Sequence, residues 1–361
     1  MNSKQGVFRH CYFMLFILLV SGQVSGQKIG EYSLSGRVVK ETIVSDVLEE
    51  NKVGLQTERA VFIYLPPSYS NSEKSFPVVY YLHNIYSDPL KELNQFDILQ
   101  SIDKSMVAKE LGEFILVAGD FTSATTGSWY ENSSTSGRWL DFVVEELVPF
   151  IESKYLVTNN QRSRALTGYF VGGRGALKLA MEYPDIFGVV YAMHPVATGT
   201  GYEPTVSIGV DWEKIHSTNT YQDIEGLGRT TIYLNICQAF LPNPDRPPFY
   251  CDFLLEKLDD EVVLNPEHNL TYRRNFLLDG MLDERAENLR KLHAMAFDWG
   301  RFDQTQAHVI SARRFSKLLT EFGIEHIGEE FAGNERNKYE GENGRFNTRV
   351  IPFLKTYLAF E

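Results

Sequence analysis

Residues 164–188 read RALTGYFVGGRGALKLAMEYPDIFG, and this stretch decides the fold. Its first residues, 164–167, form a short segment typical of a strand buried in a parallel sheet. The small and apolar residues 175–183 predict a helix. Between the two, residues 168–172 have the spacing of a nucleophile elbow, G-x-S-x-G, in which flanking glycines allow a sharp turn. The central position of this elbow carries Phe170 in place of serine.

Short apolar segments recur along the chain and alternate with helical patterns. Further strands are expected at residues 59–65, 77–82, 113–118, 188–193 and 293–299, and helices at 139–154, 307–322 and 345–358. This alternation predicts an α/β fold with a mostly parallel, twisted sheet and helices on both faces. Residues 198–290 break the alternation and are rich in proline and charge in places. We predict that they form an insertion near the active-site edge of the sheet.

The first 26 residues have the pattern of a secretory signal peptide. A polar, basic start precedes the apolar run CYFMLFILLV at residues 11–20, and the small residues 24–26 suit cleavage before Gln27. The apolar run is shorter than the roughly 20 residues that span a bilayer. We therefore expect a mature chain of residues 27–361 that is secreted or periplasmic, with no membrane span after cleavage. An uncleaved membrane anchor is the alternative.

The composition of the chain bears on which classes of binding partner it can have. The chain has 361 residues, a formal net charge of −12 and 43% hydrophobic residues. So acidic a chain is a poor candidate for binding nucleic acid or anionic membranes. Two cysteines follow the expected cleavage site, Cys237 and Cys251, and they enclose a proline-rich loop. In an exported protein they could form a disulfide, worth about 3 kcal/mol for a loop of this size, or remain free thiols.

Further segments, taken in order, resemble one known family. They are YLPPSY at 64–69, PVVYYLH at 77–83, SWYENS at 128–133, GRWLD at 137–141, FDWGRFD at 297–303 and FGIEHIGEEF at 322–331. Together with the elbow they resemble the esterase family of α/β-hydrolases, which includes feruloyl esterases, S-formylglutathione hydrolases and mycolyltransferases. The resemblance implies an α/β-hydrolase fold over nearly the whole mature chain. It also implies ester chemistry by a triad of serine, histidine and an acid.

Two of the three triad positions implied by the resemblance carry other residues. Phe170 stands at the nucleophile position and Glu335 at the base position, in the loop after the last strand. The acid position is kept as Asp303, which leaves this acid without a histidine to orient. The implied oxyanion-hole positions are Val171 and Asn84, and Asn84 replaces the glycine of the family's His-Gly pair.

Other polar residues allow weaker alternatives. His194 ends the strand after the elbow and is expected at the active-site edge, as a ligand-binding residue, a displaced base or a hydrogen-bonded structural histidine. Asp303 and His308 lie at the start of a helix, where an acid is favourable beside the helix dipole, and metal binding by this pair is a weak alternative. No group of residues has convincing metal-ligand spacing, so we expect no metal and no cofactor. Glu335 with Asp303 as a glycosidase-like carboxylate pair is a further, weaker alternative.

The sequence therefore predicts an esterase-family protein that has lost serine-hydrolase chemistry. We expect it to keep a pocket for a small ester- or carbohydrate-linked ligand. One alternative is an active carboxylic-ester hydrolase that uses a nonstandard residue or water, and another is a protein-interaction module that uses the insertion. Phe170 is expected at positive φ with its ring partly filling the old pocket. Asp303 is expected beside the loop that ends at Glu335.

Overall fold

The computed structural model describes residues 28–29, 32–124, 126–201, 209–224, 226–259, 261–336, 339 and 341–360. The predicted signal peptide at residues 1–26 and its expected cleavage site before Gln27 lie outside the described residues. Within these ranges, no helix is both long and apolar enough to cross a membrane.

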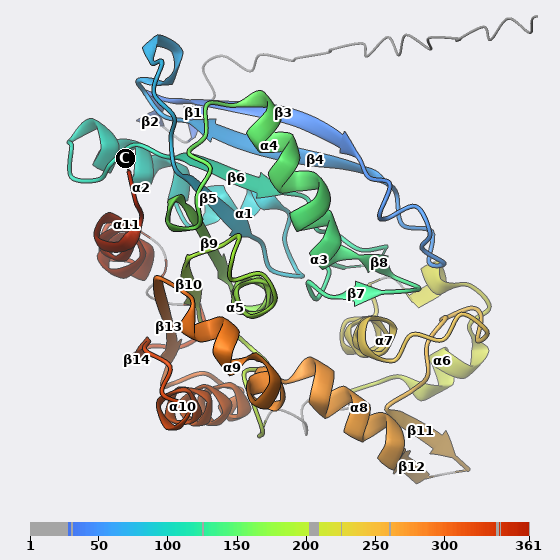
Figure 1. Cartoon of the computed structure of the whole chain (residues 1–361). Helices are drawn as coiled ribbons and strands as arrows, with labels where there is room; N and C mark the ends of the chain where they lie inside the picture. Colours follow the sequence, from blue (N-terminus) through green and yellow to red (C-terminus); the bar gives the residue numbers. More distant parts are fainter. Residues whose placement is uncertain are drawn as a thin grey trace, which may run out of the picture.

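An eight-stranded sheet forms the centre of the molecule (Figure 1), in the order β14-β13-β10-β9-β5-β6-β4-β3. The strands are β3 (Arg37–Val44), β4 (Glu58–Leu65), β5 (Val78–Leu82), β6 (Ile115–Gly119), β9 (Arg164–Tyr169), β10 (Val189–Met193), β13 (Ala294–Gly300) and β14 (Ile327–Phe331). Pairing is parallel from β14 to β6 and antiparallel between β6, β4 and β3. This confirms the mostly parallel sheet.

The burial of each strand explains which strands could be predicted. Every residue of β5, β6, β9 and β10 is buried, as expected for parallel strands covered on both faces. These strands and β4 and β13 lie within two residues of the predicted segments. Strand β3 alternates between buried and exposed residues, and it was not predicted because Arg37, Lys40 and Glu41 interrupt its apolar pattern.

Helices cover both faces of the sheet, as predicted (Figure 1). One face carries α3 (Trp139–Asp141), α4 (Val148–Lys154), α5 (Val171–Glu182) and α10 (Gln306–Glu321), and the other carries α1 (Pro89–Gln95), α2 (Ile98–Val107) and α11 (Ile351–Tyr357). The predicted helix at 139–154 is one helical run with a π-helical middle, Phe142–Leu147. The predicted helix at 345–358 likewise begins with a π-helical segment, Phe346–Val350.

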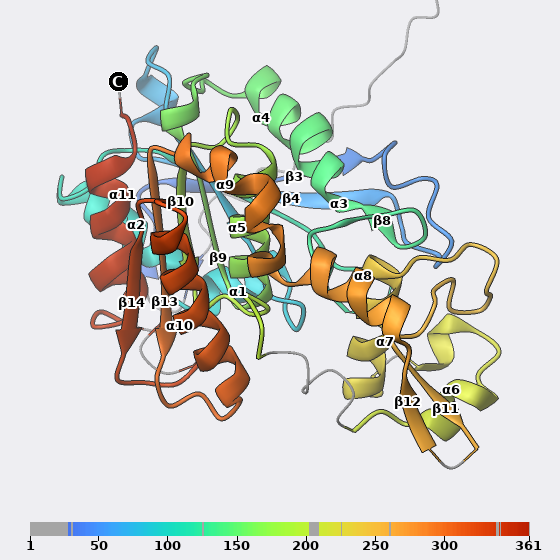
Figure 2. The ribbon, with the colours of Figure 1, turned by 60° about the horizontal axis from the view of Figure 1, so that its bottom comes forward.

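The chain between β10 and β13 adds a separate group of elements beside the sheet (Figure 2). They are α6 (Trp212–Ser217), α7 (Arg229–Phe240), the hairpin of β11 (Leu255–Leu258) and β12 (Glu261–Leu264), and α8 (Pro266–Phe276). The last helix of this segment, α9 (Leu282–Arg290), packs against α5 and so belongs to the layer that covers the sheet. In this segment Cys237 and Cys251 are buried free thiols. Burial is the main cause that raises the pKa of Cys251, and its hydrogen bond with Cys237 raises this pKa further.

The fully buried side chain of Arg174 connects these added elements to α5, the helix that follows the elbow. Its guanidinium donates hydrogen bonds to the carbonyl oxygens of Trp129, at 2.8 Å, and Phe276, at 2.9 Å. Phe276 is the last residue of α8, and Arg174 lies in the first turns of α5. The position of α7 and α8 over the sheet edge is therefore tied to the position of the elbow.

Candidate functional site

Phe170 lies at the turn from β9 into α5, with φ of 57° and ψ of −109°. This left-handed backbone costs an aromatic residue on the order of 1–3 kcal/mol. The turn is also crowded, since a Cβ added to Gly172 would lie 1.9 Å from the carbonyl oxygen of Leu82. The amide of Phe170 donates to the carbonyl oxygen of Met193 at 3.0 Å. The predicted elbow is confirmed, with Phe170 at its apex.

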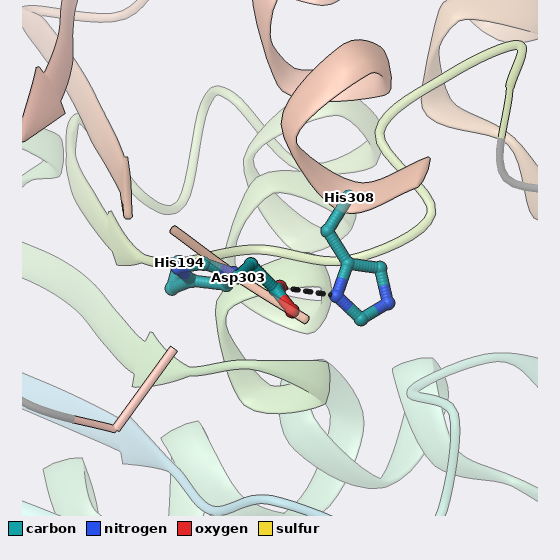
Figure 3. A group of neighbouring side chains, drawn as sticks. All are labelled: His194, Asp303 and His308. Atoms are coloured by element: carbon teal, nitrogen blue, oxygen red, sulfur yellow. Dashed lines mark hydrogen bonds and ion pairs between the residues drawn. The ribbon is translucent and has the colours of Figure 1, made fainter. Parts of the chain in front are cut away.

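Asp303 follows β13 and interacts with two histidines (Figure 3). Its Oδ2 lies 2.8 Å from Nε2 of His194 and 2.6 Å from Nδ1 of His308. Its Oδ1 accepts the amide of Thr305 at 2.7 Å, just before α10 begins. Burial favours the protonated acid, but the hydrogen bonds from His194 and His308 outweigh it and hold the pKa of Asp303 below its ordinary value. Asp303 therefore acts as a carboxylate that accepts from both histidines.

His194 uses both of its ring nitrogens inside the protein. The amide of Gly300 donates to Nδ1 at 3.0 Å, so Nδ1 carries the lone pair and Nε2 carries the proton that Asp303 accepts. The side chain is fully buried. The ligand-binding role expected for His194 is therefore corrected, because neither ring nitrogen is available to a ligand. His194 is a hydrogen-bonded histidine that positions Asp303.

His308 lies in the first turn of α10 and has the opposite tautomer. Since the Asp303 carboxylate accepts from Nδ1, the lone pair of a neutral His308 is on Nε2, on the other side of the ring (Figure 3). The ring meets that of Phe170 edge to face, with centroids 5.1 Å apart. The expectation that Asp303 has no histidine to orient is thus wrong. The sequence pattern Asp-x4-His contained this pair, but nothing in it showed that His308 faces the elbow.

The three side chains also resemble a metal site, since their ligand atoms lie within 4.8 Å of one another. Two histidines and one carboxylate are a ligand set known for transition metals. A metal bound at Nε2 of His194 would require the proton of this ring at Nδ1, where the Gly300 amide already donates. This hydrogen-bond arrangement fits a carboxylate between two histidines better than a metal centre.

A pocket of about 260 Å³ opens above the elbow. Phe170, Asp303 and His308 line it together with Trp129 and Tyr169. Helix α7 contributes further apolar wall, so the segment predicted as an insertion does lie at this edge of the sheet. The side chains of Arg229 and Arg336 stand at its rim. The lining therefore combines aromatic and aliphatic side chains with several polar and charged groups, which can orient a small molecule.

Residues 53–238 match the family model described as "Putative esterase". The chain belongs to this esterase family. It is 26% identical over 280 residues to Esterase Rv1288 of Mycobacterium tuberculosis, a match that covers 76% of this chain and 51% of that protein. It is 27% identical over 154 residues to the uncharacterized protein YbbA of Bacillus subtilis, covering 40% and 58% of the two chains. The chain thus spans about half the length of these curated relatives.

Solved structures of esterases have the same fold. A ferulic acid esterase superposes with a TM-score of 0.61 at 18% identity, covering 90% of this chain and 99% of that chain. An S-formylglutathione hydrolase from Agrobacterium tumefaciens superposes with a TM-score of 0.56 at 13% identity, covering 93% and 99%. These likenesses confirm the α/β-hydrolase fold.

In this member of the esterase family, the amides of the loop after β5 donate to acceptors within the protein. The amide of Asn84 donates to Oε2 of Glu92 at 2.9 Å, and the amide of Ile85 donates to Oδ1 of Asn84 at 2.8 Å. An oxyanion hole needs donors that point at the reacting oxygen. The oxyanion role expected for Asn84 is therefore corrected, since its amide is bound to Glu92. Val171 begins α5, where a backbone N–H has no intrahelical acceptor, so it keeps the expected position.

Glu335, at the family's histidine position, lies in the pocket wall. The Tyr169 hydroxyl donates to its carbonyl oxygen. Its Oε2 is buried and has no hydrogen-bond partner among the described residues. The amide of Phe302 donates to the carbonyl oxygen of Gly333 at 2.8 Å, which holds this loop against the one that carries Asp303. The predicted closeness of Asp303 to the Gly333–Glu335 loop is confirmed.

Proposed function

We propose that this esterase-family protein is secreted and binds a small ester- or carbohydrate-linked ligand without serine-hydrolase chemistry. The observation that carries the proposal is Phe170 at the apex of the elbow, at φ 57°. Covalent ester hydrolysis begins when a nucleophile attacks the acyl carbon. The benzyl side chain of Phe170 has no atom that can attack, so the covalent route has no first step.

The packing of the Phe170 ring supports the same conclusion. The ring stacks on His194 with centroids 6.0 Å apart and meets His308 edge to face. The ring lines the pocket together with Asp303 and His308, at the position where a triad serine would receive its substrate. The amides of Asn84 and Ile85 add to this, because the first donates to Glu92 on α1 and the second to the side chain of Asn84.

Ligand binding is proposed because a pocket remains beside the ring. Trp129 lines it, is almost fully buried, and has an indole N–H with no hydrogen-bond partner in the described part of the chain. The buried Oε2 of Glu335 is an acceptor in the same wall. Buried polar atoms without protein partners are rare, and a ligand or water commonly satisfies them. A ligand that offers both an acceptor and a hydroxyl would satisfy both atoms.

One observation favours a second candidate, an ester hydrolase that uses water directly. The Asp303–His308 pair could take a proton from a water molecule that attacks a bound ester. The engaged amides of the loop after β5 weigh against this route, because the oxyanion would receive fewer donors.

A turnover assay on short aryl esters tests the proposal. We expect the purified native protein to release no more aryl alcohol than an equal concentration of heat-inactivated protein. The Phe170→Ala variant is the matched control, since it removes the ring without adding a nucleophile. Hydrolysis by the native protein that persists in Phe170→Ala would contradict the proposal and favour the water route.

A further inference from the structure

We propose that His308 has taken over the place of the family's triad histidine, so that the acid–base half of a triad persists on a different element. The inference rests on the proposed function, because it takes Phe170 as the change that removed the nucleophile. The base then comes from the first turn of α10, five residues after its acid, instead of from the loop after β14.

The first step in the argument is the contact between Asp303 and His308. The 2.6 Å separation of Oδ2 and Nδ1 is that of a charge-assisted hydrogen bond. A carboxylate that accepts from Nδ1 fixes the tautomer of the histidine, aligns its ring and stabilises the imidazolium once it has accepted a proton. Asp303 thereby stands to His308 as a triad acid stands to its histidine.

The second step is the position of the ring. His308 and Phe170 line the same pocket and touch, with ring centroids 5.1 Å apart. The side chain of residue 170 projects from the elbow, so a nucleophile placed there would stand beside the imidazole. The side chain of His308 is 8% exposed and that of His194 is 0% exposed.

The third step excludes His194. The Gly300 amide donates to its Nδ1, so His194 can accept no further proton there while its Nε2–H is held by Asp303. Both histidines bind the same oxygen of Asp303, but of the two only His308 lines the pocket. His194 is a positioning residue, and His308 is the proton acceptor.

A cysteine at position 170 would test the role of His308 as a proton acceptor, because its alkylation can be measured without ester turnover. In the Phe170→Cys variant, the thiol proton moves to Nε2 of His308 and leaves a thiolate and an imidazolium. Iodoacetamide then alkylates the thiolate, forming a carbon–sulfur bond and releasing iodide, and the imidazolium returns its proton to solvent. The native protein supplies the background rate, since Cys237 and Cys251 are buried.

The experiment measures the alkylation rate of residue 170 against pH in four proteins: Phe170→Cys alone, and Phe170→Cys combined with His308→Gln, Glu335→Gln or His326→Gln. We expect Phe170→Cys to react at about pH 6–7, where a free thiol is largely protonated. Adding His308→Gln should lower this rate at least about tenfold and move the profile to higher pH. The matched control adds His326→Gln, a histidine that hydrogen-bonds Ser316 on α10 and lies outside the pocket lining, and it should keep the fast rate.

An equal rate with and without His308→Gln would overturn the inference. Loss of the rate in Glu335→Gln instead of His308→Gln would also overturn it, by assigning the role to Glu335. Because His308→Gln could disturb folding, long-range proton–nitrogen spectra of the native protein give a second reading. We expect Nδ1–H for His308 and Nε2–H for His194, and Nε2–H for His308 would contradict the inference. Neither measurement uses native turnover, which tests the proposed function separately.

Discussion

Phe170 keeps a backbone conformation that its own side chain disfavours. A φ of 57° is rare for an aromatic residue and costs on the order of 1–3 kcal/mol. The elbow stays in place because Gly168 and Gly172 let the strand and helix approach each other, with Leu82 close to both. The local glycine pattern explains why this turn could be predicted from the sequence even though its central residue differs from the family.

Other site residues depend on contacts that no local pattern contains. His308 reaches Asp303 because the loop after β13 folds back as α10 begins. The amide of Asn84 does not contribute to an oxyanion hole, because it donates to Glu92, eight residues later. Such roles follow from side-chain direction in the folded chain, so the sequence could indicate Asp303 and Asn84 but not their partners.

Glu92 makes stability depend on pH. It is almost fully buried, and this burial raises its pKa from 4.5 to about 7, although hydrogen bonds from the Asn84 amide and the Tyr81 hydroxyl oppose the shift. The folded state therefore holds a proton that the unfolded state has released between about pH 4.5 and 7. Stability from this group is full below that window, falls as pH rises through it, and is constant above it.

We predict that Glu92→Gln removes this part of the pH dependence. The shift corresponds to about 3 kcal/mol, and a glutamine oxygen can still accept from the Asn84 amide. Urea unfolding at pH 4.5 and pH 8 should show the native protein losing up to that much stability relative to the variant. A difference between native and variant that does not change with pH would show that Glu92 is ionised throughout.

At the scale of elements, the loop after β5 and the start of α5 determine how many backbone amides can donate to an oxyanion in the pocket. The side chain of Asn84 accepts the Ile85 amide and so turns this donor toward its own loop. Glycine at this position, as in the family, has no side-chain acceptor. The Ile85 amide would then be released for an oxyanion.

We predict that Phe170→Ser combined with Asn84→Gly hydrolyses aryl esters about tenfold or more faster than Phe170→Ser alone. Losing one oxyanion donor in a serine hydrolase lowers kcat by about 10²–10³, and a partly rebuilt hole should recover a share of this. The comparison is kcat for the two variants on the same aryl ester. Equal kcat values would mean that the Ile85 amide does not reach the substrate.

At the scale of the whole molecule, the fold was predicted from the sequence more completely than the site or the segment between β10 and β13. The apolar strands and amphipathic helices alternate along most of the chain, and the observed sheet is mostly parallel, as this alternation predicts. The segment between β10 and β13 was less predictable, because its place depends on long-range contacts such as that of Arg174 with the end of α8. Its helix α7 nevertheless forms a pocket wall, as an insertion near the active-site edge would.

Export is a prediction about the whole chain. We expect the mature protein to begin at or near Gln27, because small residues precede it after the apolar run. N-terminal sequencing of protein recovered outside the cytoplasm measures this directly. Recovery of the intact Met1 terminus from the cytoplasm would contradict export.

The central claim is that no residue of the native pocket forms a covalent intermediate. Intact-mass spectrometry after treatment with a fluorophosphonate, which acylation-competent serine hydrolases take up covalently, measures this most directly. We predict no mass gain for the native protein or for Phe170→Ala, and a single phosphonyl adduct at position 170 for Phe170→Ser. A stoichiometric adduct on a pocket residue of the native protein would contradict the account.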